Sequence, residues 1–304
     1  MSGRLKVLKF GGSSLATAQR IRTVGSVISD VSATCQPVVV VSALEGVTDS
    51  LVALARCRNP EQKASLIGQV RARHLSIASQ ILSSDELADY SVNLDQVIST
   101  LEALLGAEAD LLGKSKDEVL AAGERLSAPL IAAYVRNVGV TARAWDASQI
   151  IRTDSRFGDA SVDWVGTEES IRTWYANVDC TAIVTGFIGS DYSGRTTTLG
   201  RGGSDYSAAL FASALDAGVL ERWTDVDGIY THDPAKRPDA RKLEIIELDP
   251  VEVEHSASRI GMHDDSLEPV ARKGIPVHVR STLAPSRRGT WLIPKSASRR
   301  KPAG

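Results

Sequence analysis

Short runs of β-branched and apolar residues alternate with longer segments of helical periodicity along most of the chain. We predict these runs to be strands, at residues 6–10, 38–41, 140–145, 181–185, 221–224, 277–280 and 291–293. Continuous apolar strands that alternate with helices are typical of a parallel sheet covered on both faces. The pattern therefore predicts an α/β fold, in which an open, mainly parallel sheet is the middle layer of a three-layer α/β/α sandwich.

Helical periodicity dominates two parts of the chain. One is residues 15–28, directly after a glycine turn, and the other is residues 50–137, where no strand pattern occurs. Val97, Leu101 and Leu104 in the second part have the spacing of one helix face. We interpret this long segment as a group of helices packed on the sheet.

The composition narrows the class of protein. A chain of 304 residues is long enough for one α/β domain or two lobes, and its net charge of −2 comes from well-mixed charges of both signs. Cys35, Cys57 and Cys180 form no CxxC pair, which indicates neither a disulfide framework nor a zinc site. The sequence shows neither a signal-peptide pattern nor an apolar run long enough for a membrane span. We expect a soluble, reduced, cytoplasmic protein without nucleic-acid or membrane partners.

Polar residues stand at or directly after the ends of several predicted strands. They are Ser42, Asp146, Thr185 and Asp225. In open α/β sheets, ligands bind at the carboxyl ends of the strands. These positions therefore predict a ligand-binding crevice along that edge of the sheet.

A glycine-rich loop at residues 197–205 gives the strongest indication of a ligand site. It contains three glycines and Arg201, ends in Ser204 and Asp205, and leads into an apolar helical pattern. Glycines let the backbone approach a ligand closely, and the N–H groups at a helix start favour anions. The guanidinium of Arg201 has the fork of donors that suits a carboxylate. The loop therefore predicts a small anionic substrate next to a phosphate.

A second glycine turn, Lys9-Phe10-Gly11-Gly12-Ser13, connects the first predicted strand to the first predicted helix. A lysine there can bind a phosphate with its ammonium group while backbone N–H groups bind the other oxygens. Paired glycines alone are weak evidence, because many strand–turn–helix units contain them for packing. Together with the glycine-rich loop, this turn favours a phosphate site.

Other familiar motifs are incomplete. Gly113-Lys114-Ser115 lacks the earlier glycine and the preceding strand of a P-loop. Tyr206 stands in place of the last glycine of a nucleophile elbow. The five histidines lack metal-ligand spacing, so no side chain is assigned to a metal.

Taken in chain order, the motifs resemble those of the amino-acid kinase family and, within it, of aspartokinase catalytic domains. The matching segments are residues 9–14, 41–49, 123–127, 185–189, 197–205, 223–230 and 233–234. The resemblance covers nearly the whole chain and implies an amino-acid kinase catalytic domain at residues 1–293. It further implies a substrate-binding lobe at 1–190, a nucleotide-binding lobe at 191–293 with a hinge near 186–195, and a flexible basic tail at 294–304.

The resemblance also implies an activity and the residues that carry it. Aspartokinases use ATP and Mg²⁺ to phosphorylate the side-chain carboxylate of L-aspartate to 4-phospho-L-aspartate, the first step toward lysine, threonine and methionine. The catalytic residues would be Lys9, which bridges the transferred phosphoryl group, and Asp205, which orients Lys9. The substrate-binding residues would be Thr48, Glu124, Phe187, Arg201, Gly202, Gly203 and Ser204. The nucleotide-binding residues would be Lys9, Phe10, Gly11, Gly12, Ser13, Thr224, Asp225, Tyr230, Lys236 and Arg259, with Mg²⁺ carried by the ATP.

Elementary chemistry agrees with these roles. A carboxylate is already a nucleophile at neutral pH, so the difficulty is to hold two anions together, which is a task for cations and backbone donors. Arg201 can bind the α-carboxylate of the substrate, and Glu124 can bind its α-ammonium group. Plainer alternatives stay open. Glu124 and Arg125 could form a salt-bridged helix start, Asp205 could stabilise the first turn of a helix, and Asp225 could only shape a turn.

Two departures from the family pattern concern cations. Ala235 stands where many aspartokinases have an arginine, and Ile260 stands where a phosphate-contacting lysine is usual. We expect weaker nucleotide binding, or a less stabilised transition state, unless Arg259 or Lys236 substitutes.

The resemblance ends near residue 293, where most aspartokinases continue into regulatory ACT domains that bind end-product amino acids. We expect a catalytic unit without built-in feedback regulation, which lysine and threonine do not inhibit. The alternatives are a kinase for a related amino acid, a non-catalytic nucleotide- or amino-acid-binding module, and the kinase part of a bifunctional protein. A homodimer and a fused partner domain both fit the sequence.

Overall fold

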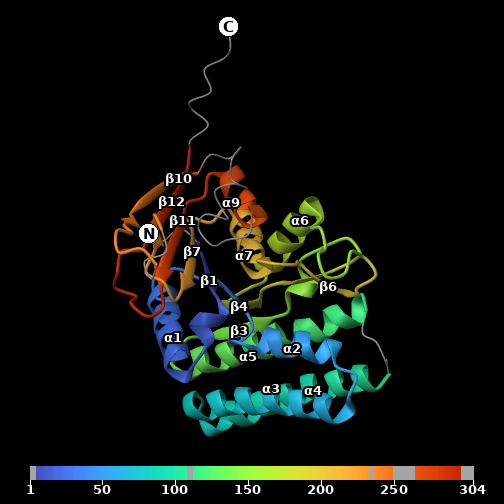
Figure 1. Cartoon of the computed structure of the whole chain (residues 1–304). Coiled ribbons are helices and arrows are strands. Elements are labelled where there is room, and N and C mark those ends of the chain that lie inside the picture. Colours follow the sequence, from blue (N-terminus) through green and yellow to red (C-terminus); the bar gives the residue numbers. More distant parts are fainter. Residues whose placement is uncertain (1–4, 108–111, 233–235, 249–263, 296–304) are drawn as a thin grey trace.

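An eight-stranded sheet forms the middle of the molecule in the computed structural model, which describes residues 5–107, 112–232, 236–248 and 264–295 (Figure 1). In sheet order its strands are β10 (Ile245–Leu248), β12 (Thr290–Pro294), β11 (Val277–Ser281), β7 (Val219–Thr224), β1 (Lys6–Phe10), β2 (Val38–Val41), β4 (Thr181–Thr185) and β3 (Ala142–Trp145). All neighbouring strands from β11 to β3 are parallel, whereas β12 pairs antiparallel with β11 and parallel with β10. The predicted mainly parallel sheet is therefore confirmed.

Helices cover both faces of this sheet, which confirms the predicted α/β/α layers (Figure 1). On one face, α1 (Ala18–Ser32) and α5 (Lys114–Asn137) pack on the sheet. Three further helices pack against these two, namely α2 (Val47–Arg56), α3 (Pro60–Ile81) and α4 (Ser84–Ala107). The other face carries α6 (Trp164–Tyr175), α7 (Gly203–Ala214) and α9 (Glu268–Lys273).

The two cores follow from the alternation of side chains along the central strands. On β1, Leu8 and Phe10 belong to the core shared with α1 and α5, whereas Val7 belongs to the core shared with α7. Lys9 lies on the same side as Val7, because side chains alternate along a strand. The α7 face of β1 therefore carries a charged side chain next to apolar ones.

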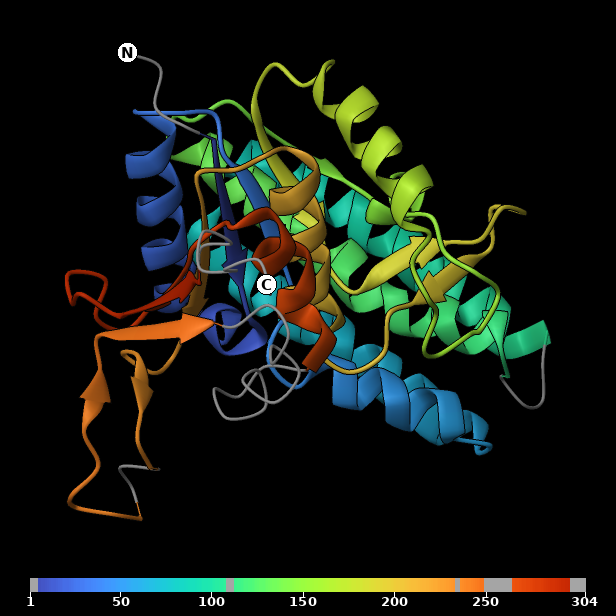
Figure 2. The same ribbon diagram turned by 90° about the horizontal axis from the view of Figure 1, so that it is seen from above.

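Two small hairpins extend the fold. β5 (Ile188–Ser190) pairs with β6 (Thr196–Thr198), and β8 (Ile229–Tyr230) pairs with β9 (Lys242–Leu243). The orange segment in Figure 2, which carries β8 and β9, projects from the body of the molecule. The first hairpin occupies the segment where we expected a hinge, and one sheet joins strands from both expected lobes. The lobe boundary therefore stays a prediction.

The remaining elements agree with the sequence pattern to within a few residues. β3 begins at Ala142, two residues later than predicted, and β7 begins at Val219, two residues earlier. The described part of residues 50–137 is helical and contains no strand, as predicted. β12 includes Pro294, so it extends into the expected tail, whose residues 296–304 lie outside the described part. None of the helices that the structure describes is both long and apolar enough to cross a membrane.

Candidate active site

The turn after β1 lies at the carboxyl edge of the sheet. β1 runs between β2 and β7, with Lys9 in register with Val40 on one side and Arg222 on the other. The turn then passes close to the loop after β2, since a Cβ atom on Gly12 would lie 3.0 Å from the carbonyl oxygen of Ala43. Glycine permits this approach because it has no side chain. The edge therefore presents backbone groups close to the Lys9 side chain.

Lys9 forms a buried ion cluster with Asp205 and Arg222. The Lys9 Nζ atom lies 2.8 Å from Oδ1 of Asp205, and Nε of Arg222 donates to the same oxygen at 3.2 Å. Asp205 comes from the first turn of α7, which packs on β1 and β7. The exposed fractions of the side chains are 9% for Lys9, 9% for Asp205 and 16% for Arg222. In this group, here called the Lys9 cluster, two cations share one carboxylate.

The protonation of the Lys9 cluster follows from burial and charge. Burial raises the pKa of the Asp205 carboxyl, but Lys9 and Arg222 outweigh this effect and bring it to about 2. Burial lowers the pKa of Lys9, Asp205 opposes that shift, and Arg222 adds to it. The carboxylate is therefore ionised, and the two cations repel each other. A bound anion would relieve this repulsion.

Glu124 carries a second buried carboxyl group, in the middle of α5. Its Oε1 atom accepts a hydrogen bond of 3.1 Å from the N–H of Ala43, whereas Oε2 is buried without a hydrogen-bond partner among the described residues. Burial raises the pKa of Glu124 to about 8, and the Ala43 N–H and the Lys9 charge oppose part of that rise. A buried acceptor without a partner costs free energy until a donor completes it. Glu124 is therefore suited to bind a cationic group.

The turn after β4 meets the start of α7. Phe187 has a φ of 70°, which is unusual for a residue other than glycine, and its N–H donates to Oγ of Ser207 at 3.0 Å. A Cβ atom on Gly186 would lie 2.7 Å from Cβ of Ser204, and one on Gly203 would lie 2.9 Å from Cδ2 of Phe187. Strained backbone of this kind clusters at functional sites. The structure thus brings Phe187, Gly203 and Ser204 together.

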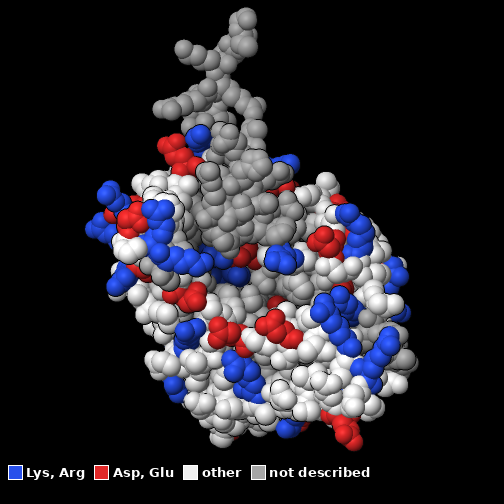
Figure 3. Space-filling model, in the orientation of Figure 1, with Lys and Arg blue, Asp and Glu red and all other residues white. Residues whose placement is uncertain are grey.

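A cavity of about 620 Å³ adjoins the Lys9 cluster through Arg222. It lies between the end of β7, the β8 strand and the loop after β11, and its lining includes Asp225, Tyr230 and Arg287. Thr224, the last residue of β7, donates to Oδ1 of Asp225 at 3.0 Å. The volume is in the range of small-molecule sites. On the face drawn in Figure 3, basic and acidic side chains border a hollow near the middle of the molecule.

Arg201 and Thr48 lie apart from this arrangement. Arg201 is exposed and lines a separate cavity of about 240 Å³ together with Asp159 and Tyr206, and Lys9 does not line that cavity. Thr48 is exposed in the first turn of α2. The structure therefore places Lys9 and Arg201 next to different cavities. Asp205, the ion partner of Lys9, and Tyr206, which lines the cavity of Arg201, are consecutive residues of α7.

The remaining predicted nucleotide-binding residues differ in how they are placed. Phe10 points away from the Lys9 side and stacks on Trp223, with 5.9 Å between the ring centroids, so its backbone alone faces the site. The carbonyl oxygen of Ser13 accepts a hydrogen bond of 2.6 Å from Arg20. Lys236 is exposed. Arg259, Ile260 and Ala235 lie outside the described residues. Within the described part, no three His, Cys, Asp or Glu side chains form a group that could hold a metal ion.

The sequence analysis missed Arg222. Arg222 belongs to a predicted strand. Its place in the cluster depends on Lys9 in the neighbouring strand and on Asp205 in α7. The signal was a basic residue inside an otherwise buried strand, since its neighbours Glu221 and Trp223 are both buried. Such a residue needs an ionic partner, which the sequence alone does not locate.

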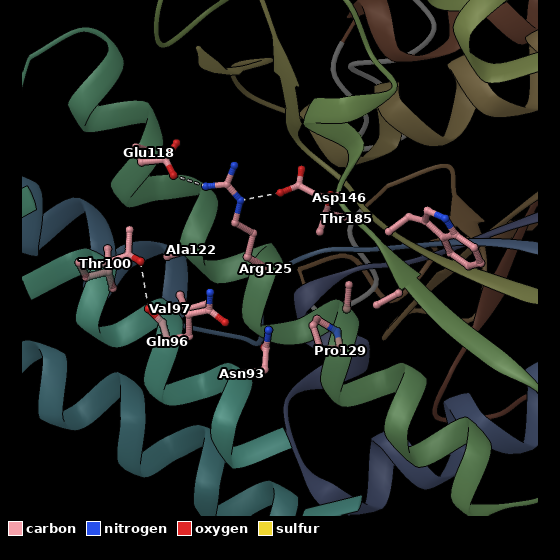
Figure 4. Close-up of a pocket in the computed structure, with 14 residues that line it drawn as sticks. Asn93, Gln96, Val97, Thr100, Glu118, Ala122, Arg125, Pro129, Asp146 and Thr185 are labelled. Carbon is pink, nitrogen blue, oxygen red and sulfur yellow. Dashed lines mark hydrogen bonds and ion pairs between the residues drawn. The ribbon is translucent and has the colours of Figure 1, made fainter. Parts of the chain in front are cut away.

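A cavity of about 310 Å³ between α4, α5 and the end of β3 has a different character (Figure 4). Arg125 lies between two carboxylates there: it donates to Asp146 at 2.7 Å and forms an ion pair with Glu118. Another of its N–H groups donates to the Thr196 hydroxyl at 3.0 Å. We call Arg125, Glu118 and Asp146 the Arg125 cluster. Glu124 takes no part in this cluster. The alternative of a salt-bridged helix start at Glu124 and Arg125 therefore holds only for Arg125, and its ion pairs lie in the middle of α5 rather than at its start.

Comparisons with known proteins agree with this architecture. A sequence model described as the amino acid kinase family matches residues 4–281. The aspartokinase of Chlamydia trachomatis is 35% identical over 287 residues, which cover 94% of this chain and 64% of that protein. Lysine-sensitive aspartokinase 3 of Escherichia coli is 34% identical over 297 residues, which cover 95% of this chain and 64% of that protein. The chain thus spans somewhat less than two thirds of the length of these relatives.

Solved structures give the same result. The structure of E. coli aspartokinase III in complex with aspartate and ADP matches with a TM-score of 0.86 at 32% identity, and the match covers 96% of this chain and 65% of that one. Carbamate kinase from Giardia lamblia, at 14% identity and a TM-score of 0.56, shows the fold alone. Because the family match extends over residues 4–281 and the fold agrees along nearly the whole chain, this protein belongs to the amino acid kinase family.

Proposed function

We propose that this chain transfers the terminal phosphoryl group of ATP to the side-chain carboxylate of L-aspartate, which gives 4-phospho-L-aspartate and ADP. The observation that carries the proposal is the buried Lys9 cluster near Glu124, whose Oε2 atom lacks a partner in the described structure. Cations for a phosphate and an acceptor for an ammonium group therefore occur in one region. The named aspartokinases among its relatives, one of them solved with aspartate and ADP, support the choice of substrates.

On the phosphate side, Lys9 binds the transferred group while the N–H group of Gly12 binds one of its oxygens. The N–H group of Gly11, which donates to the carbonyl oxygen of Trp223 at 3.4 Å, turns to the phosphate when the nucleotide binds. Asp205 holds Lys9 in position through the ion pair of 2.8 Å. The rest of the nucleotide occupies the cavity of about 620 Å³ that Asp225 lines. Mg²⁺ enters with ATP and is bound by the phosphates, the usual arrangement for this ion in kinases.

On the amino-acid side, Glu124 accepts a hydrogen bond from the α-ammonium group with its Oε2 atom. Phe187, Gly203 and Ser204 form the adjacent wall at the start of α7. Arg201 precedes this helix and is exposed, so its long side chain can turn to bind the α-carboxylate. The other residues that we assign to this side are Thr48 and Gly202.

Binding of both α-groups leaves the side-chain carboxylate of aspartate as the group that faces ATP. One of its oxygens attacks the γ-phosphorus, so that a C–O–P linkage forms. The bond from this phosphorus to the bridging oxygen breaks, and ADP leaves with the electron pair. No proton moves in this step, because the nucleophile is already ionised. Lys9 and the glycine N–H groups stabilise the charge on the equatorial oxygens.

Trapping of the acyl phosphate with hydroxylamine tests the proposal. With Mg²⁺-ATP and L-aspartate we expect a hydroxamate whose rate of formation is proportional to the amount of protein. L-Glutamate has one more methylene, and N-acetyl-L-aspartate lacks the cation that Glu124 binds. Both should react at least about tenfold more slowly. Product from another amino acid but not from aspartate would mean that the other amino acid is the substrate. Binding of ATP and aspartate without product would indicate a non-catalytic binding module.

A further inference from the structure

Asp117 carries a buried carboxyl group that has no role in the site described above. It lies in the first turn of α5 and is fully buried. Its Oδ2 atom accepts hydrogen bonds from two backbone N–H groups, that of Gly158 at 2.8 Å and that of Thr198 at 2.7 Å. Its Oδ1 atom is buried without a hydrogen-bond partner among the described residues. Asp117 therefore joins the start of α5 to two segments that lie 41 and 81 residues further along the chain.

The burial of Asp117 costs free energy that an apolar side chain would not cost. Burial raises the pKa of the Asp117 carboxyl, and the N–H groups of Gly158 and Thr198 oppose that rise. The acceptor atom without a partner adds to the cost. A buried polar group of this kind is typical of positions where function requires a particular local geometry.

The two segments that this carboxyl group holds flank the loop that carries Arg201. Thr198 is the last residue of β6 and stands three positions before Arg201. Gly158 directly precedes Asp159, and Gly200 packs so closely on Asp159 that a Cβ atom on Gly200 would overlap the carboxylate. The base of the Arg201 loop is therefore attached to α5 on both sides.

The same helix carries Glu124. Asp117 and Glu124 are seven residues apart in α5, so they lie on one face of the helix, about 10 Å apart along its axis. The hairpin strand β6, which leads into the Arg201 loop, packs against α5. One helix thus holds both the ammonium-binding carboxyl group and the base of the loop with the carboxylate-binding arginine.

We propose that Asp117 is a positioning residue for aspartate binding, which holds the Arg201 loop at a fixed distance from Glu124. The proposal rests on the proposed function, in which Glu124 and Arg201 bind the two α-groups of the substrate. The loop does not fix its own position, because Gly200 and Gly202 on either side of Arg201 have left-handed φ values of 68° and 77° and glycine is conformationally permissive. Its base therefore has to be set by contacts from another element, and Asp117 supplies two of them.

A purely structural role for Asp117 makes a different prediction. A residue that only stabilises the fold changes the free energy of unfolding and leaves the affinity of the folded protein for aspartate unchanged. A residue that acts through Arg201 changes this affinity, and it does so only while Arg201 is present. A double-mutant cycle therefore separates the two roles.

The experiment is calorimetric titration of Asp117→Ala, Arg201→Met and the double variant with L-aspartate and, separately, with Mg²⁺-ADP. We expect Asp117→Ala to raise the Kd of aspartate by about tenfold and to leave the Kd of ADP within about twofold. In the Arg201→Met background, the same change should raise the Kd of aspartate by less than about twofold. Asp117→Asn keeps an oxygen that can accept both N–H groups, so it should stay within about threefold of wild type.

The matched control is Asp191→Ala. Asp191 is also a buried aspartate that accepts backbone N–H groups, from Ser193 at 2.9 Å and from Arg195 at 3.0 Å. It holds the turn between β5 and β6, at the end of the hairpin opposite to Thr198. Asp191→Ala should lower the free energy of unfolding and leave the Kd of aspartate within about twofold.

An unchanged Kd of aspartate in Asp117→Ala, an equal rise for aspartate and ADP, or the same rise with and without Arg201 would overturn the proposal. If Asp117→Ala fails to fold, Asp117→Glu decides in its place. It keeps the acceptor but displaces it by one methylene, so the Kd of aspartate should rise about threefold or more, and an unchanged Kd would overturn the proposal.

The titrations do not require turnover, so the two proposals can fail separately. Hydroxamate formation by the wild type, together with an unchanged Kd of aspartate in Asp117→Ala, would refute the positioning role alone. The expected pattern of Kd values without any hydroxamate would refute the proposed phosphoryl transfer and leave the role of Asp117 intact.

Discussion

The Lys9 cluster and the Arg125 cluster are both groups of three charged side chains beside a cavity, and they differ in charge balance. The Lys9 cluster has two cations for one carboxylate and is buried. The Arg125 cluster has two carboxylates for one cation, and its side chains are 21% to 28% exposed. Arg125 uses N–H groups at Nε and at both terminal nitrogens in bonds to protein partners. The second cluster is therefore satisfied by the protein itself.

The comparison teaches that a cavity alone does not identify a site. The cavity beside the Arg125 cluster is lined by residues that hold α5 to β3 and β6, and its ions are paired. The edge beside the Lys9 cluster combines a buried lysine, a glycine turn and an acceptor without a partner among the described residues. Groups left incomplete by the protein are the ones available to a ligand.

The largest effect is expected from Lys9→Met. This change removes the ammonium group that binds the transferred phosphoryl group, so the rate of hydroxamate formation should fall about a thousandfold. The fold should persist, because Arg222 still pairs with Asp205. The control is Lys6→Met on the same strand, whose ammonium pairs with Glu221 at 3.1 Å. Turnover of Lys9→Met at the rate of the control would contradict the role of Lys9.

Glu124→Gln should raise the KM for aspartate by about a hundredfold, because the ammonium group loses a charged acceptor. The KM for ATP should change little. Glu118→Gln makes the same chemical change on the same helix within the Arg125 cluster, and it should leave both KM values within about twofold. Steady-state kinetics of the two variants measure these values. An equal rise in the KM for aspartate in both variants would contradict the different roles of the two clusters.

The pH dependence of aspartate binding sharpens the same contrast. Burial raises the pKa of Glu124 to about 8, so below that pH the carboxyl group must lose a proton when an ammonium group binds. The apparent affinity should therefore fall by up to about tenfold for each pH unit below 8.

The folded protein also holds the proton of Glu124 more tightly than the unfolded chain. The contribution of Glu124 to stability thus decreases as the pH rises from 4.5 to about 8.

Titration calorimetry with aspartate between pH 6 and 8, compared with Glu124→Gln, measures this effect. The variant should bind weakly and with little dependence on pH over that range. A wild-type affinity that is equally flat would show that Glu124 is not the group that accepts the ammonium.

The smallest effect on activity is expected from Arg125→Met. It removes the one cation between two carboxylates and should lower the free energy of unfolding by about 1–3 kcal/mol. The rate of hydroxamate formation should stay within about threefold of wild type, because the cluster binds no substrate. Chemical denaturation and the hydroxamate assay measure the two quantities. A loss of activity as large as that of Lys9→Met, with unchanged stability, would reverse the assignment of the clusters.

Much of the fold was predictable from local patterns. The run Val38–Val41 predicts a strand buried on both faces, and the structure confirms it as β2 in the middle of the sheet. The Gly11-Gly12 turn follows a strand at its carboxyl end, as predicted. These predictions succeed because periodicity and glycine turns are properties of neighbouring residues. The cytoplasmic location, the homodimer and the fused partner domain are tested by none of these observations and stay predictions.

The parts that the sequence missed depend on residues that meet only in the folded chain. Arg222 gains its meaning from Lys9 and from Asp205, which come from different elements. The direction of Arg201 depends on its neighbours Gly200 and Gly202, which adopt left-handed φ values of 68° and 77°. Such turns set the direction of a side chain, and composition alone does not specify it.

A crystal structure with L-aspartate and the non-hydrolysable analogue AMP-PNP, together with Mg²⁺, would test the account most directly. We predict that oxygens of the terminal phosphates lie within about 3 Å of Lys9 Nζ, and that the substrate ammonium group contacts Glu124 Oε2. Phosphates bound in the cavity of the Arg125 cluster, or an ammonium group distant from Glu124, would contradict it.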